Sequence, residues 1–431
     1  MKFTRVILAA AGLVLLAAAL PAQADPAAMA EKIRQLEAQI AAQQAQMEQQ
    51  LAAQRAMLEE MKQAMEESKA ETTTEIKKTA LEVSQKEITK EIKNRGLTGW
   101  KFGGDVRLRY EGTYFDDSNL DRNRERYRLR FKVTKNIGWG VTGIFQLASG
   151  ETAVGDSPTQ TLTDSFDKKA IWIDQAYSTW TPDISGHFFT FGGGKVANPF
   201  VSTPMVWDTD INPDGFYQTL RHDFNGIEPY FTFAQLMIKE NAAAKDAYAL
   251  AYQGGANFKS GKWTGSANVA YYDYVRYDTN YKYDGGNTTT TVNGVKFLDA
   301  RNFRIVDVLG KVAYGWKYPV EGFVDYAVNT GAEGPFGDQD TAWSVGGSFG
   351  ANKKQKDWSF AYRYAHIEAN SVVGAFSDSD FGKNNRKGSE LKFKYNIFDP
   401  LTIAASFWDT SSIKPLTPSW TRLMIDLEYK F

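Results

Sequence analysis

Two neighbouring segments of the chain, residues 100–114 and 126–133, alternate between apolar and charged side chains. In the first segment the even positions carry apolar residues, tyrosine and glycine, whereas the odd positions are mostly charged. Successive side chains of an extended chain point to opposite faces, so the pattern predicts two strands, each with one apolar and one charged face. The charged faces hold Asp105, Arg107, Arg109, Glu111, Arg126, Arg128, Arg130 and Lys132.

Similar alternating segments, about sixteen in all, follow one another to the C-terminus, which is typical of a transmembrane β-barrel. Short links such as 225–226 and 260–261 alternate with long polar loops such as 150–168 and 278–302. Bacterial outer-membrane barrels have short turns at one end and long loops at the other. The last segment also alternates and ends on Phe431. The prediction is an all-β transmembrane β-barrel of about sixteen antiparallel strands over residues 97–431.

The N-terminal part differs from the rest of the chain. Residues 1–24 have Lys2 and Arg5 before an apolar run and an A-x-A site, which predicts a signal peptide and export. Residues 27–94 contain no glycine and no aromatic residue, and their apolar positions recur at heptad-like spacing. Residues 25–96 are therefore predicted to form an α-helical coiled coil in the periplasm, with a disordered polar arm as the alternative. No later run is long and apolar enough for a membrane helix.

Composition and motifs argue against several classes of function. Cysteine is absent, and 50 basic residues nearly balance 51 acidic ones, which favours neither thiol chemistry nor a nucleic-acid partner. Residues 138–143 fit G-x-G-x-x-G and residues 346–350 fit G-x-S-x-G, but both lie in predicted strands without the helix that each motif needs. The three histidines lack metal-ligand spacing. We expect no enzyme activity, no cofactor and no metal.

The charged faces predict a water-filled interior. An Arg or Lys turned toward lipid at mid-depth would cost about 2 to 4 kcal/mol, so the charged faces must line a lumen. Lys392 and Lys394 belong to a similar face, whereas Glu321 and Asp325 indicate an acidic sector. The lumen is therefore predicted to have basic and acidic sectors, and anions are favoured only near the first two strands.

Loop 196–214 combines apolar residues such as Phe200 and Trp207 with three carboxylates, Asp208, Asp210 and Asp214. The apolar residues do not suit a solvated loop tip. We expect the loop to fold inward and its carboxylates to form a constriction opposite the basic strands, because opposed charges at a narrow point give a pore its ion preference. The alternative is an external loop that packs on a neighbouring subunit.

The signal peptide, the coiled coil, the strand Gly104–Glu111, the basic segment 126–130 and the terminal Phe431 together resemble the putative porin family of Gram-negative outer membranes. The resemblance implies a homotrimeric passive channel for small hydrophilic solutes, embedded in outer-membrane lipid. Two alternatives stay open: a channel selective for anions or sugars, and a structural tether whose arm contacts the cell wall.

Overall fold

The computed structural model describes residues 98–431, except 152–154, 156, 164, 183–188, 334–336 and 416, together with five isolated positions between 31 and 62. The chain divides into two units, Met1–Thr98 and Gly99–Phe431. The predicted signal peptide and, apart from those five positions, the predicted coiled coil lie outside the described residues. Within the described part, no helix is both long and apolar enough to cross a membrane.

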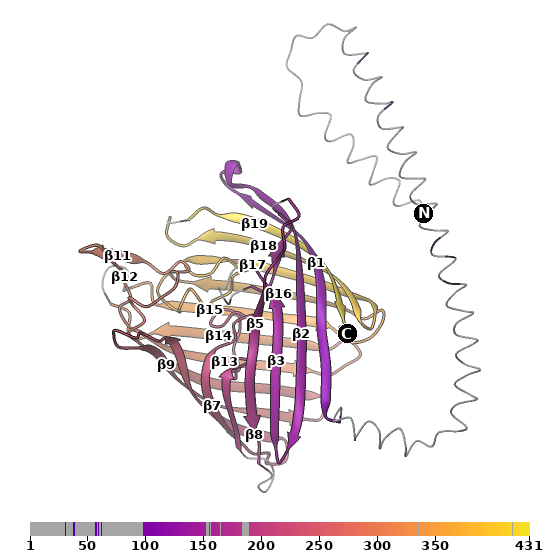
Figure 1. Ribbon diagram of the computed structural model, residues 1–431, viewed down its shortest axis with the longest axis horizontal. Helices are drawn as coiled ribbons and strands as arrows, with labels where there is room; N and C mark the ends of the chain where they lie inside the picture. The colour runs from indigo at the N-terminus through magenta and orange to yellow at the C-terminus, as the bar shows by residue number, and fades with distance from the viewer. Residues whose placement is uncertain are drawn as a thin grey trace. The chain divides into compact units, whose positions relative to one another are not determined.

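Sixteen antiparallel strands of the described chain form a closed barrel (Figure 1), which confirms the predicted barrel. The barrel closes because the first strand pairs with the last along eleven residue pairs, for example Leu108 with Leu427. The strands are β1 (Trp100–Phe115), β2 (Arg122–Gly138), β3 (Val141–Ser149), β5 (Ile171–Trp180), β6 (Phe189–Lys195), β7 (Asp214–Arg221), β8 (Ile227–Lys239), β9 (Ala247–Ser260), β10 (Trp263–Val275), β13 (Phe303–Tyr314), β14 (Val320–Asn329), β15 (Thr341–Gly350), β16 (Trp358–Ile367), β17 (Arg386–Phe398), β18 (Leu401–Ser412) and β19 (Trp420–Lys430).

Three shorter strands and one helical turn lie in the connections. β4 (Gln160–Thr161) pairs with β2, and β11 (Thr289–Val292) pairs with β12 (Val295–Leu298) as a separate hairpin. The 3-10 turn η1 (Ser118–Leu120) joins β1 to β2.

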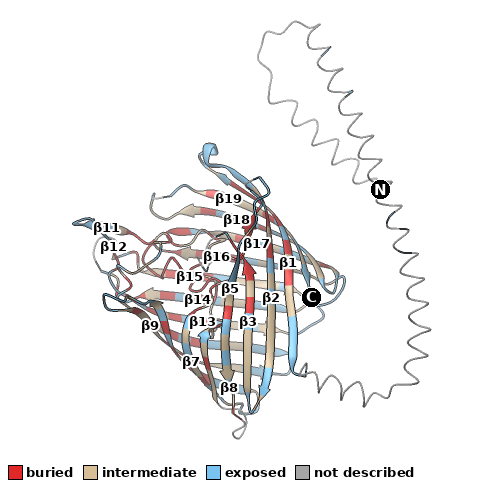
Figure 2. Cartoon of the chain, in the orientation of Figure 1, coloured by how far each residue is buried: buried red, intermediate tan, exposed pale blue. Residues whose placement is uncertain are grey.

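The alternating apolar and charged residues lie on opposite faces of the barrel wall, the apolar ones outside and the charged ones inside. On β1, Leu108 is 55% exposed on the outer face, whereas its neighbours Arg107 and Arg109 are less than a tenth exposed on the inner face. Figure 2 shows the same change from exposed to buried positions along several strands. Exposed tryptophans gather at the end with the short turns, as expected for residues at a membrane interface: Trp100, Trp139, Trp180, Trp263 and Trp316.

The loop between β6 and β7, residues 196–213, lies inside the barrel, and we call it the first inward loop. Its Met205 and Trp207 are buried, and the Phe200 ring packs edge-on against Tyr272 of β10 at 5.4 Å between centroids. Two hydrogen bonds join Val201 to the side chain of Gln253 on β9. The inner wall behind the loop has small side chains, which leave room for it. We call this surface the alanine wall: Ala234, Ala249, Ala251, Ala270, Ala327, Ala342 and Ala365.

A second loop, residues 368–385 between β16 and β17, packs against the first. Its Phe376 ring stacks on Trp207 at 5.3 Å between centroids, and the Phe376 carbonyl accepts a hydrogen bond from the Asp208 amide. Val372, Val373 and Phe381 are buried with the first loop in one apolar cluster. We call residues 368–385 the second inward loop. The two loops together fill the side of the barrel next to the alanine wall.

Candidate functional site

The inner faces of β1, β2 and β19 form a continuous charged surface, which we call the basic wall. Strand register places like charges directly opposite each other, Arg107 across from Arg128 and Arg109 across from Arg126. Such pairs repel each other unless opposite charges lie between them. The basic wall consists of Asp105, Arg107, Arg109, Glu111, Arg124, Arg126, Arg128, Arg130, Lys132, Arg422, Asp426 and Glu428.

Carboxylates on the basic wall bridge the guanidinium groups. Asp105 accepts hydrogen bonds from Arg128 and Arg130, each at 2.7 Å. Asp426 binds Arg109 through both oxygens, at 2.7 and 2.9 Å. Such charge-assisted contacts are about twice as strong as neutral hydrogen bonds and hold each guanidinium plane in one orientation.

Glu111 is the most enclosed carboxylate of the basic wall, with 1% of its surface exposed. It contacts Arg124 and accepts a hydrogen bond from Arg126 at 2.8 Å. Two guanidinium groups of β2 therefore share one buried carboxylate of β1.

The structure places the ten predicted pore-lining residues on inner faces of the barrel. Eight belong to the basic wall, and Lys392 and Lys394 follow on β17. Lys392 contacts Glu390, but Lys394 has no carboxylate within 4.0 Å among the described residues. Lys132 donates to the Gln175 amide oxygen at 3.1 Å rather than to a carboxylate.

The three predicted constriction residues lie in different places. Asp210 of the first inward loop faces the basic wall, with 3.7 Å between its Oδ1 and Nη1 of Arg130. Asp214 is the first residue of β7, where its exposed carboxylate lies 3.4 Å from Nζ of Lys195.

Asp208 turns toward the second inward loop instead. Its carboxylate accepts hydrogen bonds from the Ser379 amide at 2.9 Å and the Ser379 hydroxyl at 2.7 Å. Burial, reinforced by the nearby Asp378 and Asp210 carboxylates, raises the pKa of Asp208 to about 8. At neutral pH this group therefore contributes little negative charge to the passage.

The second inward loop supplies an acidic residue that the sequence analysis missed. Asp380 lies 3.8 Å from the Arg109 guanidinium, and its backbone carbonyl accepts a hydrogen bond from Arg422 at 2.8 Å. Burial alone would raise the pKa of Asp380, but Arg109 and Arg422 lower it to about 2, so it stays ionised. The sequence does contain a signal for this loop. Phe376 and Phe381 flank the acidic pair Asp378 and Asp380, and the same mixture of apolar and acidic residues predicted that loop 196–214 folds inward.

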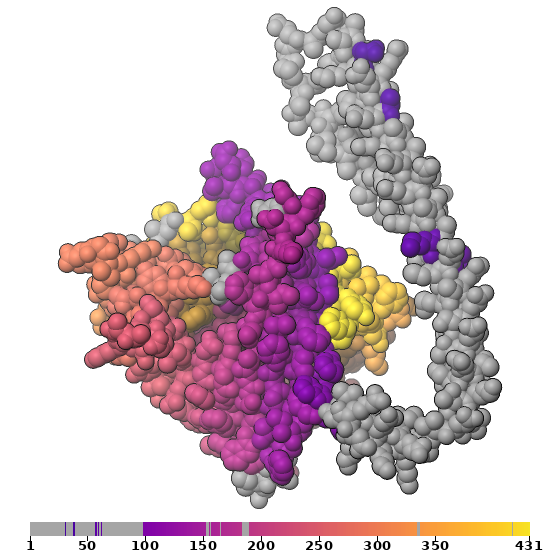
Figure 3. All heavy atoms as spheres, viewed as in Figure 1, coloured from indigo at the N-terminus to yellow at the C-terminus, as the bar shows by residue number. Residues whose placement is uncertain are grey.

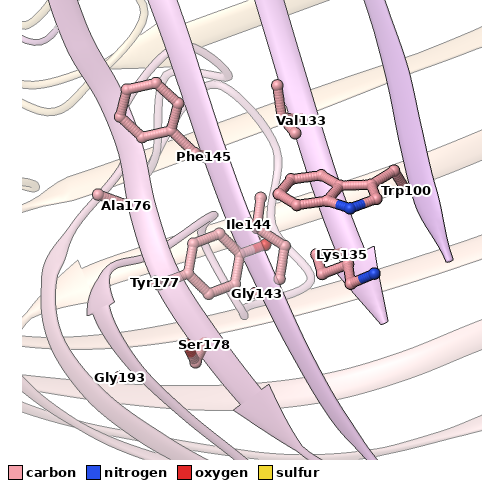
Figure 4. Close-up of a pocket in the computed structure, with 10 residues that line it drawn as sticks. All are labelled: Trp100, Val133, Lys135, Gly143, Ile144, Phe145, Ala176, Tyr177, Ser178 and Gly193. Atoms are coloured by element: carbon pink, nitrogen blue, oxygen red, sulfur yellow. The ribbon is translucent and has the colours of Figure 1, made fainter. Parts of the chain in front are cut away.

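The outer wall near the short turns has a hollow of about 520 Å³ beside Trp100 and Lys135. Figure 4 shows the indole of Trp100 beside the Lys135 side chain, with Phe145 and the small residues on neighbouring strands. The Lys135 Nζ lies 5.1 Å from the indole centroid. Small residues form much of its floor: Gly143, Ala176, Ser178 and Gly193.

A comparison with solved structures supports the barrel fold. A solved structure of OprB from Pseudomonas putida, at high pH, has a TM-score of 0.54 with 12% sequence identity, and covers 79% of this chain and 96% of that one. A triple mutant of the Rhodopseudomonas blastica porin has a TM-score of 0.42 at 10% identity, covering 77% of this chain and 100% of that one. A search of curated protein sequences returned no match.

The family model described as "Putative porin" matches residues 118–297 and 297–431, which is most of the chain. The match covers the barrel from β2 to the terminal strand, including both inward loops, and leaves out β1. Members of this family are channels rather than enzymes, and a barrel with an apolar outer face belongs in the outer membrane. The chain belongs to the putative porin family and forms an outer-membrane channel.

Proposed function

We propose that this porin passes small hydrophilic anions more readily than cations, along the basic wall and past the two inward loops. The observation that carries the proposal is an imbalance in ion pairing. Every carboxylate of the basic wall contacts an Arg or Lys, whereas several lumen-facing cations contact no carboxylate within 4.0 Å in the described chain. These cations are Lys132, Arg386, Lys394 and Arg422.

The hydrogen bonds of Lys132, Arg386 and Arg422 go to neutral oxygens. The carboxylates that act on Lys132, Lys394 and Arg422 lie beyond 4.0 Å, so they compensate these charges only in part. Arg386 donates to the Thr410 hydroxyl and the Pro418 carbonyl, and Arg422 donates to the Thr113 hydroxyl and the Asp380 carbonyl. Hydrogen bonds to neutral oxygens hold a guanidinium in place but do not cancel its charge. The field in the lumen beside the basic wall is therefore positive, which concentrates anions there.

The inward loops narrow the passage opposite the basic wall. Asp210 and Asp380 each approach an arginine of the wall, at 3.7 and 3.8 Å. A solute anion that enters this region replaces part of these weak contacts, while the closer pairs within the wall keep the arginines in place. We infer that Asp210 and Asp380, rather than Asp208, form the acidic side of the constriction.

Reversal potentials in planar bilayers under a KCl gradient test the proposal. Wild-type channels should give the sign of an anion-preferring pore, and Lys394→Glu together with Lys132→Glu should shift the potential toward cation preference. Lys262→Glu, in a short turn outside the lumen, is the matched control and should change nothing. A wild-type potential of zero or of the cation sign would refute the anion preference.

Liposome swelling separates a channel from a tether. An open channel admits small sugars and amino acids at rates that fall with solute size, whereas a barrel that serves only as an anchor admits none. The arm at residues 25–96, its periplasmic location and its contact with the cell wall stay predictions.

We also propose that the barrel assembles as a homotrimer through the outer face shown in Figure 3, where β1, β2, β3 and β5 lie toward the viewer. The support is the hollow beside Trp100, since small outward residues on a lipid-facing wall leave room for the side chains of a second copy. Ala176→Trp should shift the detergent-solubilised protein from trimer to monomer in native mass spectrometry. Ala267→Trp on β10, another exposed position, should leave the assembly unchanged.

A further inference from the structure

Two carboxylates lie sealed between the first inward loop and the barrel wall, on the side away from the basic wall. Asp307 on β13 and Asp325 on β14 are both 0% exposed. No Lys, Arg or His nitrogen in the described residues comes within 4.0 Å of either carboxylate. Burying an ionised carboxylate without a compensating charge is very unfavourable, so this pair must take up either protons or a cation.

The strand register brings the two acidic residues and a serine together. Asp325 lies directly opposite Ser344 of β15, and its other cross-strand partner, Leu309, is two residues along β13 from Asp307. The carboxyl groups of Asp307 and Asp325 lie within hydrogen-bonding reach of each other. The Thr203 hydroxyl of the first inward loop donates a hydrogen bond to Asp325 Oδ2.

Apart from the contact between the two carboxyl groups, several oxygen atoms in this cluster lack a protein hydrogen-bond donor. Both carboxylate oxygens of Asp307, Oδ1 of Asp325 and the hydroxyl of Ser344 are fully buried and make no hydrogen bond to a protein donor. Ser344 is itself 0% exposed, and its side chain lies on the same inner face as Asp325. Buried polar atoms in folded proteins nearly always have partners, so this group of oxygens indicates a bound species.

A single proton accounts for only part of these observations. A proton shared by the two carboxyl groups would leave one negative charge buried, with Lys311 of β13 acting on Asp325 only from beyond 4.0 Å. It would also leave the Ser344 hydroxyl without a hydrogen-bond partner. A divalent cation neutralises both carboxylates and takes the remaining oxygens as ligands. Ca²⁺ prefers carboxylate and neutral oxygen ligands and tolerates irregular geometry, which suits a site built from two carboxylates and a hydroxyl.

We propose that Asp307 and Asp325 bind a divalent cation of the calcium class, with the Ser344 hydroxyl as a neutral ligand. The ion fastens the first inward loop to the wall, because Thr203 is hydrogen-bonded to one of its carboxylate ligands. No described part of the chain gathers three or more acidic, histidine or cysteine side chains around one point. The site therefore depends on both carboxylates, and loss of either one removes half of its negative charge.

Terbium luminescence tests the site on the full-length protein in detergent after treatment with EDTA. Tb³⁺ replaces Ca²⁺ at oxygen sites, and Tyr272, which packs 5.8 Å from Trp207 between ring centroids, is close enough to Asp307 to transfer excitation. The wild-type protein should give a saturable signal that Ca²⁺ displaces. Asp307→Asn should weaken Tb³⁺ binding at least about tenfold. Glu321→Gln, an exposed acid on the same strand as Asp325, is the matched control and should keep the wild-type affinity.

Thermal unfolding of the wild-type protein supplies a second readout that does not depend on the variant folding. Excess Ca²⁺ should raise the melting temperature relative to EDTA, since a ligand that binds only the folded state stabilises it. Equal melting temperatures in Ca²⁺ and EDTA, or a displaceable terbium signal that Asp307→Asn leaves intact, would overturn the proposal. Stability that responds to pH but not to Ca²⁺ would assign a shared proton to the pair instead. Neither readout measures permeation, so the result is independent of the proposed anion preference.

Discussion

The basic wall and the alanine wall are built from the same kind of strand, yet their inner faces carry opposite kinds of side chain. On β1 and β2 the inner positions hold long charged residues, whereas on β9, β10 and β14 several inner positions hold alanine. The difference follows from what each wall contacts. Carboxylates of neighbouring strands hold the guanidinium groups of the basic wall, whereas the alanine wall lies against a packed loop. The size of the inner side chains thus indicates which part of the barrel interior stays open.

The carboxylates of the two walls also differ in whether an arginine lies beside them. Asp105, Glu111 and Asp426 each contact at least one arginine on the basic wall. Asp307 and Asp325 have no such partner and are completely enclosed. The arginine-rich wall is therefore stabilised by its own ion pairs, whereas the enclosed pair has no arginine beside it and is the site of the proposed cation.

Removing a carboxylate from the basic wall should produce the largest change in stability. Glu111→Ala removes the carboxylate that Arg124 and Arg126 share, so the two guanidinium groups repel each other. Breaking a buried ion pair in this way lowers the free energy of unfolding by about 3 to 5 kcal/mol. Because water reaches parts of this wall, we expect the lower end of that range. Urea unfolding in lipid vesicles measures the free energy. Glu125→Ala, an exposed residue of β2, should change it by less than about 0.5 kcal/mol. A loss below about 1 kcal/mol for Glu111→Ala would show that solvent screens the Glu111 contacts.

A second prediction concerns pH and the packing between the two inward loops. The pKa of Asp208 is raised from 3.8 to about 8 in the folded protein, so the folded state holds a proton that the unfolded state releases. The contribution to stability is fully present below pH 3.8 and is lost as the pH rises toward 8, with a slope of up to about 1.4 kcal/mol per pH unit. Asp208→Asn should remove this slope. The free energy of unfolding is measured against pH for the wild type and for Asp208→Asn, and the difference between the two curves isolates the contribution of Asp208. Parallel curves would mean that Asp208 is ionised in the folded protein.

The sequence was sufficient to predict the barrel because alternation at every second residue is a direct consequence of strand geometry. The strands that close the barrel, β1 and β19, were also the ones with the cleanest patterns. Trp420, the first residue of β19, shows where the alternation is a poor guide. It is 5% exposed on the inner face and lies between the Arg386 and Arg422 guanidiniums, at 5.0 and 4.3 Å from its ring. The alternation assigns a residue to a face only when it continues on both sides of that residue. At the end of a strand it continues on one side only, so the face of Trp420 could not be predicted.

The path of the loops could be predicted only in part. Apolar residues in loop 196–214 predicted an inward loop, but which carboxylate meets which arginine depends on turns that no periodic pattern encodes. Asp208 and Asp210 are two residues apart, yet one contacts Ser379 and the other faces Arg130. The second inward loop contributes Asp380 through contacts that span more than two hundred residues of sequence. Such contacts become visible only when the barrel is closed.

The smallest expected effect separates Asp210 from Asp214, two acids of one loop segment that face different surroundings. Asp214 forms an exposed pair with Lys195, and such surface pairs contribute about 0 to 1 kcal/mol to stability. Asp214→Asn should therefore leave both stability and ion preference close to wild type. Asp210→Asn removes a negative charge beside Arg130 and should shift the reversal potential modestly toward anions. Single-channel recordings of the two variants under the same salt gradient make the comparison. Equal shifts would place both carboxylates along the ion path and would extend the constriction to the start of β7, whereas a shift in Asp210→Asn alone would confine it to the tip of the first inward loop.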